Sequence, residues 1–228
     1  MNPNCTREEQ DAFCADVAEG LHALAQPLTI LRSAILLMAA AKENGADCAR
    51  YMNLSAAQIE RACRLFSSLQ GLMASRLTEA EPEAIDMTKL LARVIEERSH
   101  ALDGRGVGLA ADQMTMRTTV VGDLQRTEQA LSAALETAVS VSSAGDVVKV
   151  DSSISDGFLE CTFESTSRQD NSLKSSDRLN LSLTKANMLS QRGRYEFTQE
   201  PFRISLALPV HASVVTDSET ICCTACTD

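Results

Sequence analysis

Apolar residues recur with a heptad rhythm near the start of the chain. They alternate spacings of three and four residues at Cys14, Val17, Leu21, Leu24, Leu28, Leu31, Ile35 and Met38. Such spacing places one apolar stripe on one face of an α-helix. It predicts a long helix from about Arg7 to Lys42, and the turn-forming residues from Asn44 to Asp47 should end it.

A second stripe predicts a second long helix after this turn. Its members are Ser55, Ile59, Ala62, Phe66, Leu69 and Met73. Two such helices joined by a short connection form an antiparallel hairpin. A lone hairpin exposes its apolar seams, so we expect a second copy of the chain to cover them in a four-helix bundle. The longest unbroken apolar run, Ala34 to Ala41, has eight residues, which predicts no membrane insertion.

The pattern changes after the charged, proline-bearing segment from Glu79 to Glu83, which we take as the domain boundary. Helices are predicted at 86–101, 123–141 and 179–191, with strands at 107–111, 116–121, 147–154, 158–164, 195–198 and 203–208. This order predicts an α+β fold: a hairpin domain over 7–78, then an α/β sandwich over 84–210 with one mixed sheet and helices on one face. Residues 211–228 are expected to be a disordered tail.

Composition narrows the function. The 228 residues carry a formal net charge of −10, which argues against binding nucleic acid. The N-terminus lacks the apolar core of a signal peptide, so the expected location is the cytoplasm, with reduced thiols. Of the eight cysteines, Cys222, Cys223 and Cys226 cluster near the C-terminus, where a metal or redox role is the alternative to a disordered tail.

His22 is the most interesting of the three histidines. It follows the seam residue Leu21, so it should be exposed on the flank of the first helix. Pro27 lies five residues later, and a proline within a helix frees a carbonyl and kinks the chain. From spacing alone, an ordinary exposed histidine beside a tolerated bend explains both residues. His100 and His211 have no clustered partners in the sequence, so no metal site is expected.

The segment from His22 to Thr29, His-Ala-Leu-Ala-Gln-Pro-Leu-Thr, resembles the H box of sensor histidine kinases. The helix beginning at Asp123 is similar to the family's N box, and the segment from Leu179 to Tyr195 is similar to its Gly-Leu-Gly-Leu-Ser helix and following strand. The resemblance spans about residues 10–210. It implies a dimeric hairpin whose His22 is the phospho-acceptor, followed by a domain of the ATP-binding type.

The chain departs from that family where nucleotide should bind. Ala133 and Thr137 occupy the positions of the N-box asparagines that hold nucleotide and Mg²⁺, and Asn180 stands where the family has its glycine-rich signature. No glycine occurs between Phe158 and Arg192, although close backbone approach to phosphate needs glycine. The acidic residue that follows the family's histidine is also missing. We therefore expect no ATP, metal or other cofactor to be bound in the usual way.

These residues favour a histidine phosphotransfer protein, in which His22 exchanges a phosphoryl group with receiver-domain aspartates. The receiver would supply Mg²⁺, Gln26 would orient a water or the partner, and a sensor kinase is a further candidate partner. Three alternatives stay open: a pseudokinase module that docks receivers or kinases without catalysis, a divergent active histidine kinase, and an unrelated helical protein with a chance H box. Arg50, Arg61 and Arg64 on the second helix are expected to be solvated or to meet an acidic receiver.

Overall fold

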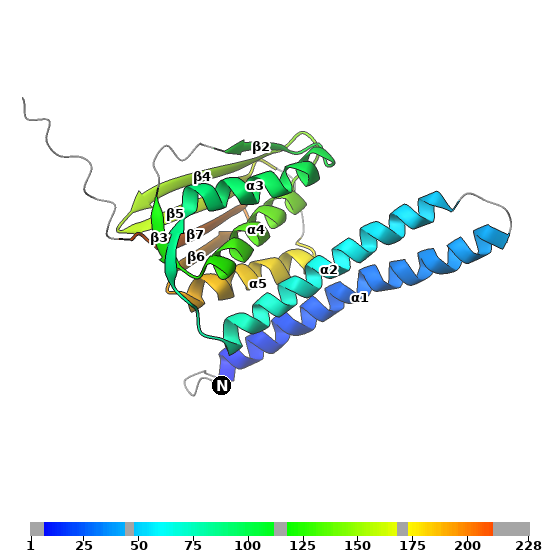
Figure 1. The fold of residues 1–228 in the computed structure, drawn as a ribbon, viewed down its shortest axis with the longest axis horizontal. Helices are drawn as coiled ribbons and strands as arrows, with labels where there is room; N and C mark the ends of the chain where they lie inside the picture. The colour runs from blue at the N-terminus through cyan, green and yellow to red at the C-terminus, as the bar shows by residue number, and fades with distance from the viewer. Residues whose placement is uncertain (1–6, 44–47, 112–117, 168–172, 212–228) are drawn as a thin grey trace, which may run out of the picture.

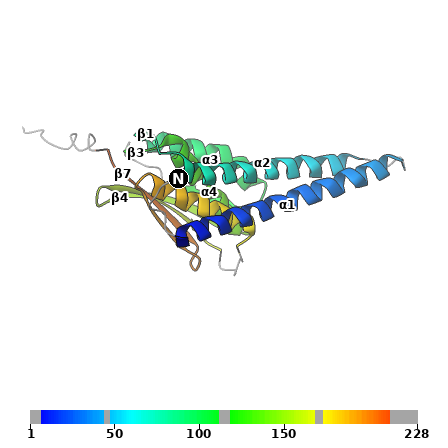
Figure 2. The same cartoon turned by 90° about the horizontal axis from the view of Figure 1, so that it is seen from below.

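The computed structural model describes residues 7–43, 48–111, 118–167 and 173–211 (Figure 1). A hairpin of two long helices, α1 (Arg7–Glu43) and α2 (Ala49–Leu77), precedes an α/β domain. Both helices match the elements predicted from the heptad stripes. The predicted turn at 44–47 and the cysteine cluster of the tail lie outside the described residues. Seen from below, the hairpin projects well beyond the domain (Figure 2).

The α/β domain holds the remaining helices and all the strands of the described chain. Its elements are β1 (Glu83–Asp86), α3 (Met87–Asp103), β2 (Gly108–Ala111), β3 (Thr119–Gly122), α4 (Leu124–Val141), β4 (Val147–Ser155), β5 (Phe158–Ser165), α5 (Ser175–Ser190), β6 (Arg194–Thr198) and β7 (Arg203–Pro209). The larger sheet has the order β2-β4-β5-β7-β6, in which only the β2–β4 pair is parallel. The predicted mixed α+β sandwich is therefore present.

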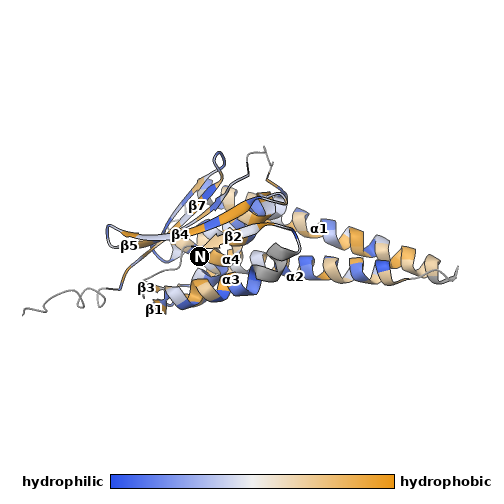
Figure 3. Ribbon diagram, turned by 90° about the horizontal axis from the view of Figure 1, so that it is seen from above, coloured by the Kyte–Doolittle hydropathy of each residue, from blue (hydrophilic) through white to orange (hydrophobic). Residues whose placement is uncertain are grey.

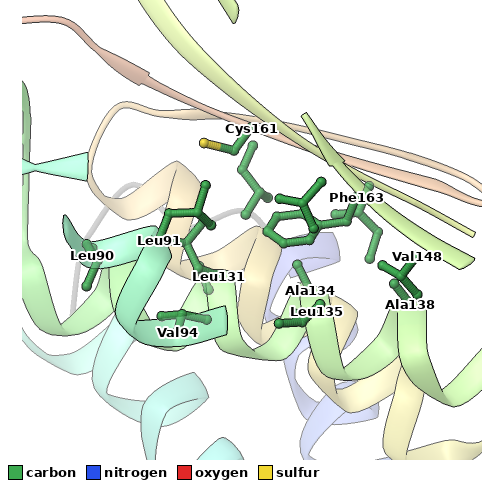
Figure 4. Close-up of a cluster of buried hydrophobic side chains, with 14 of the residues drawn as sticks. Leu90, Leu91, Val94, Leu131, Ala134, Leu135, Ala138, Val148, Cys161 and Phe163 are labelled. Atoms are coloured by element: carbon green, nitrogen blue, oxygen red, sulfur yellow. The ribbon is translucent and has the colours of Figure 1, made fainter. Parts of the chain in front are cut away.

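The core of this domain lies between α3, α4 and one face of the larger sheet (Figure 4). Leu131 and Leu135 of α4 pack beneath Phe163 of β5, and all three side chains are fully buried. Burial alternates along β4 because successive side chains of a strand point to opposite faces. The β4–β5 hairpin turns at Asp156 and Gly157, whose φ angles of 52° and 77° fit the Asp-Gly turn expected from the sequence.

Three boundaries differ from the sequence prediction. An unpredicted strand, β1, begins at Glu83, the last residue of the segment taken as linker, and pairs with β3 to form a separate two-stranded sheet, so the described strands form two sheets and not one. The strand expected over 116–121 is seen at Thr119–Gly122, and residues 116–117 are not described. The last helix begins at Ser175 and not at Leu179, because the backbone N–H of Lys174 donates to Asp177 Oδ2 (2.9 Å) and caps a polar first turn that carries no apolar periodicity.

The composition of helix α1 is relevant to the prediction that the chain does not insert into a membrane. Its stretch Gln10–Ala41 is long and apolar enough to cross a membrane by length and composition. Counting only unbroken apolar runs was too strict, because isolated polar residues such as His22, Gln26 and Arg32 interrupt a stretch that is apolar on average. A helix that packs within a soluble protein, or a signal sequence, passes the same test, so this is weak evidence and the absence of membrane insertion stays a prediction.

Candidate functional site on the hairpin and its docking face

The hairpin does not stand free of the domain: both of its helices pack against α5, and α2 also contacts α4 (Figure 1). A small apolar cluster joins the hairpin to α4 and α5. Its buried members are Ala23, Leu65, Leu69, Leu72, Ala133, Leu179 and Leu183. Gly20 allows α1 to lie close to α2 and α5, because a Cβ at this position would lie 2.5 Å from Leu69 Cδ2 and 3.0 Å from Leu179 Cδ1. The sequence stripes did not predict this contact.

His22 lies on the side of α1 that faces away from this contact. Gly20 and Ala23 are buried against α2 and α5, and Pro27 is buried too, whereas His22 is exposed. Gln26 follows His22 by four residues, which places it one turn later on the same face of the helix, and it is exposed too. The structure therefore places His22 and Gln26 of the H-box-like segment on one accessible surface.

Pro27 lies inside α1, and the helix continues unbroken through it from Arg7 to Glu43. Because proline has no N–H, the carbonyl of Ala23 lacks its usual helical donor. In the following turn the Thr29 hydroxyl donates to the carbonyl of Ala25 (2.9 Å), and the Ser33 hydroxyl donates to the carbonyl of Thr29 (3.0 Å). Both hydroxyls are exposed.

One acidic side chain near His22 was not singled out from the sequence. Glu19 precedes His22 by one helical turn, and its Oε1 lies 3.8 Å from Nη1 of Arg178 on α5. Arg178 is largely exposed, so this ion pair contributes little to stability. Its position still links the turn that carries His22 to the domain. The three-residue spacing between Glu19 and His22 was the available signal.

The nucleotide-type positions of α4 are used for packing. Ala133 is 5% exposed and touches the leucines of α2 and α5 in the apolar cluster. Thr137 is fully buried, and its hydroxyl donates to the carbonyl of Ala133 (2.7 Å) within the same helix. Neither residue presents a free oxygen to a hard cation or an amide to a nucleotide. The residues present at these two positions therefore do not fit the nucleotide and Mg²⁺ contacts that the resemblance implies.

Asn180 on α5 belongs to the same contact. Its side chain is 5% exposed, and Ser68 of α2 donates a hydrogen bond to its Oδ1 (3.2 Å). Ala133 and Asn180 are thus buried against the hairpin, and Thr137 is fully buried as well. Among the residues that the structure describes, no group of three or more histidine, cysteine or acidic side chains could hold a metal ion.

Arg126 fastens the end of the hairpin to the domain, a role that the sequence did not reveal. Its Nη2 donates to both the carbonyl oxygen and the hydroxyl of Thr78, each at 2.9 Å. Its Nε lies 3.5 Å from Oδ2 of Asp123, whose Oδ1 caps α4 by accepting the backbone N–H of Arg126 (3.0 Å). Because Arg126 is 7% exposed, these bonds are shielded from water and fix the angle at which α2 leaves the domain.

Each hairpin helix also presents an exposed apolar row. Apolar and polar residues alternate along both helices of the ribbon (Figure 3). The rows have heptad spacing: Leu21, Leu28 and Ile35 on α1, and Ile59, Phe66 and Met73 on α2, all between 45% and 56% exposed. Cys14 of the predicted α1 seam is exposed too, whereas its remaining members, Val17, Leu24, Leu31 and Met38, are half-buried. One half of that predicted stripe therefore faces the hairpin interior, while the other half is left uncovered by this chain.

Comparisons with known proteins define the class of fold. No family model matches the chain. No curated protein sequence matches it either. Among solved structures, the Acinetobacter baumannii histidine kinase AdeS aligns with a TM-score of 0.64 and 20% identity, over 83% of this chain and 98% of that one. Histidine kinase ThkA, solved with the response regulator TrrA, aligns with a TM-score of 0.67 and 14% identity, over 90% of this chain and 64% of that one.

A third structure, full-length ShkA in complex with AMPPNP, aligns with a TM-score of 0.58 and 16% identity, over 71% of this chain and 38% of that one. The chain therefore has the fold of sensor histidine kinases, a helical hairpin followed by an ATPase-like domain. The fold expected from the resemblance is confirmed. At these identities, the likeness establishes the fold alone.

Proposed function

We propose that this chain is a histidine phosphotransfer protein of a two-component phosphorelay. The observation that carries the proposal is a contrast within one fold: His22 remains exposed on its helix, while Ala133 and Asn180 are buried against or bonded to the hairpin and Thr137 is fully buried in α4. A site that binds and turns over ATP needs those positions open. A site that exchanges phosphoryl groups with a docked partner needs only the histidine.

The proposed step is a phosphoryl exchange between His22 and an aspartyl phosphate of a receiver domain. An unprotonated imidazole nitrogen attacks the phosphorus, a P–N bond forms, and the P–O bond to the aspartate breaks, leaving its carboxylate. The reverse step passes the group to a second receiver. The receiver's own Mg²⁺ would offset the charge on the transferring group. Gln26, one turn from His22, is suited to hold a water or a receiver group by its amide.

The class of partner is supported by the solved complex of ThkA with a response regulator, since the present chain has the ThkA fold. The exposed rows on α1 and α2 support a homodimer, because six large apolar side chains at heptad spacing match the seam of a four-helix bundle. Phe66→Asp should convert a dimer into a monomer in light scattering. Leu189→Asp, at an exposed position of α5, should leave the mass unchanged.

Phosphoryl transfer is tested by incubating the purified chain with a phosphorylated receiver domain. We expect wild-type protein and His211→Ala to acquire an acid-labile, base-stable label, and His22→Ala to acquire none. Label on His22→Ala, or none on the wild type, would refute the transfer. Receiver binding that persists without any transfer would instead support the pseudokinase module.

Autophosphorylation by a divergent kinase is tested separately by titration with ATP and Mg²⁺. We expect neither phosphorylation of His22 nor hydrolysis of ATP. Autophosphorylation of the wild type that is lost in His22→Ala would replace our proposal with the kinase alternative.

A further inference from the structure

A cleft of about 1010 Å³ lies where the end of the hairpin joins the α/β domain. It is lined by residues 75–80, which end α2 and begin the linker, by Arg126 in the first turn of α4, and by residues 190–192 at the end of α5. Three separate elements thus meet around it. The sequence analysis predicted no site at this place.

The cleft is separate from the positions at which the family binds nucleotide. Ala133, Thr137 and Asn180 do not line it. Arg126 is near the N-terminal end of α4 and Gln191 follows the C-terminal end of α5, whereas Thr137 and Asn180 lie near the opposite ends of the same two helices. A ligand in this cleft would therefore not occupy a remnant of the nucleotide site.

Two buried N–H donors of this cleft lack an acceptor. Arg126 and Gln191 both line the cleft, and each residue is 7% exposed. Nη1 of Arg126 and Nε2 of Gln191 have no hydrogen-bond partner among the residues that the structure describes. Gln191 Oε1 accepts the backbone N–H of Asp123 (2.7 Å), which identifies the other end of the amide as the unused donor. Because buried polar groups are nearly always hydrogen-bonded, two orphan donors in one cleft indicate an acceptor ligand.

The charge of the cleft favours an anion of low charge. Arg76, Arg126 and Arg192 line it together with one carboxylate, Glu79, which gives a formal charge of 3 − 1 = +2. Asp123, the ion-pair partner of Arg126 (3.5 Å), does not line the cleft, and counting it lowers the sum to 3 − 2 = +1. The whole chain carries −10. One or two carboxylate groups offset a local charge of this size.

We infer that this cleft binds a ligand through a carboxylate group, which accepts hydrogen bonds from Nη1 of Arg126 and Nε2 of Gln191. Carboxylate oxygens only accept hydrogen bonds, and a guanidinium is their strongest donor in proteins. Each nitrogen has less than 1 Å² of exposed surface, so a small rearrangement of the cleft wall accompanies entry, and the new hydrogen bonds offset its cost. The exposed Arg192 would meet the solvent-facing part of the ligand.

Two sources of the carboxylate are distinguishable. One is a small organic acid from solution, since the cleft is as large as a small-molecule site. The other is the chain itself: Asp217 and Glu219 follow Pro209, a residue of the cleft wall, by eight and ten residues. Eight extended residues span about 26 Å, and a tethered group has a high effective concentration. Residues 212–228 include no lysine, arginine or histidine that would oppose this contact.

The test titrates the full-length, isotope-labelled chain with succinate at constant ionic strength and follows the side-chain amide signal of Gln191 by NMR. We expect a saturable shift of this signal and a raised melting temperature. Gln191→Glu keeps an oxygen for the Asp123 N–H but replaces the donor, and it should weaken binding in calorimetry by about tenfold or more. Arg192→Gln, at an exposed side chain, should weaken binding by about fivefold and decides alone if Gln191→Glu does not fold. Arg105→Gln removes a charge at the other end of α4 and should leave the affinity unchanged.

A chain that carries both Asp217→Asn and Glu219→Gln tells the two sources apart. A ligand from solution predicts equal succinate binding by this chain and by the unchanged one. A ligand from the chain itself predicts a lower melting temperature and succinate binding that is tighter by about tenfold or more, because the competing carboxylates are gone.

Three results overturn the inference. They are no succinate binding by either of these chains, equal weakening by Arg105→Gln, and inorganic phosphate that binds about tenfold more tightly than succinate, which would show a phosphate site. His22→Ala should bind succinate like the unchanged chain, so this test is independent of phosphotransfer.

Discussion

Restoring the family's asparagine at position 133 should destabilise this protein without creating a nucleotide site. Ala133 is 5% exposed and packs against the leucines of α2 and α5. The Ala133→Asn change inserts an amide into an apolar cluster that contains Leu65, Leu69 and Leu179. The larger side chain would push α2 away from α4 and α5 or lose its hydrogen bonds to water.

The expected cost follows from three contributions. A buried polar group without a partner costs about 1–3 kcal/mol. Added volume in a packed contact costs about 1–3 kcal/mol, and the lower helix propensity of asparagine costs about 0.7 kcal/mol. Together they predict a loss of roughly 3–7 kcal/mol, which is a large part of the stability of a typical domain.

Urea unfolding followed by circular dichroism measures this loss. The matched control is Ala92→Asn at an exposed position of α3, where only the propensity difference of about 0.7 kcal/mol should be seen. Equal losses in the two variants would mean that the hairpin does not cover α4. Saturable ATP binding gained by Ala133→Asn, with stability kept, would mean that position 133 faces an open nucleotide pocket.

Three further changes test other contacts. Arg126→Met removes the two hydrogen bonds to Thr78 and should cost about 2–3 kcal/mol in urea unfolding, with faster proteolysis of the segment after α2; an unchanged cleavage rate would contradict this role. Burial raises the pKa of the Cys161 thiol to about 12, so iodoacetamide at pH 8 should label the exposed Cys63 and leave Cys161 unmodified in mass spectra; comparable labelling would show that the core opens readily. Phe163→Ala should cost about 3–5 kcal/mol in the same unfolding assay, and a loss below 1 kcal/mol would show that the core is loosely packed.

Local signals predicted much of the fold. The heptad stripes predicted both helices of the hairpin, and Asp123 was correctly identified as the cap of α4. The Asp156-Gly157 pair correctly predicted the β4–β5 turn. These features depend on residues close in sequence, through helix period, capping and turn conformation. The strand β1 was missed because four residues that pair with the distant β3 carry no local pattern of their own.

For the candidate site, too, the sequence predicted the local features and missed the contacts between distant segments. The spacing of His22 and Gln26 placed both residues on one face of α1, and their exposure agrees with it. The sequence also identified Ala133, Thr137 and Asn180 as departures from a family pattern. It did not show that Ala133 and Asn180 had become part of a contact with the hairpin, because Leu69 and Ala133 are distant in the chain and meet only when α2 lies on α4 and α5.

The sequence by itself therefore determined the helical hairpin, the mixed α/β domain and the position of His22, since each follows from periodicity or from neighbouring residues. Only the tertiary structure decided which half of the α1 stripe is buried, how Arg126 holds the end of the hairpin, and where Arg76, Arg126 and Arg192 converge. Those arrangements depend on how separate elements dock. The docking of the hairpin on the domain depends on close packing at Gly20 and on charged side chains from different helices. Neither feature produces a periodic pattern in the sequence.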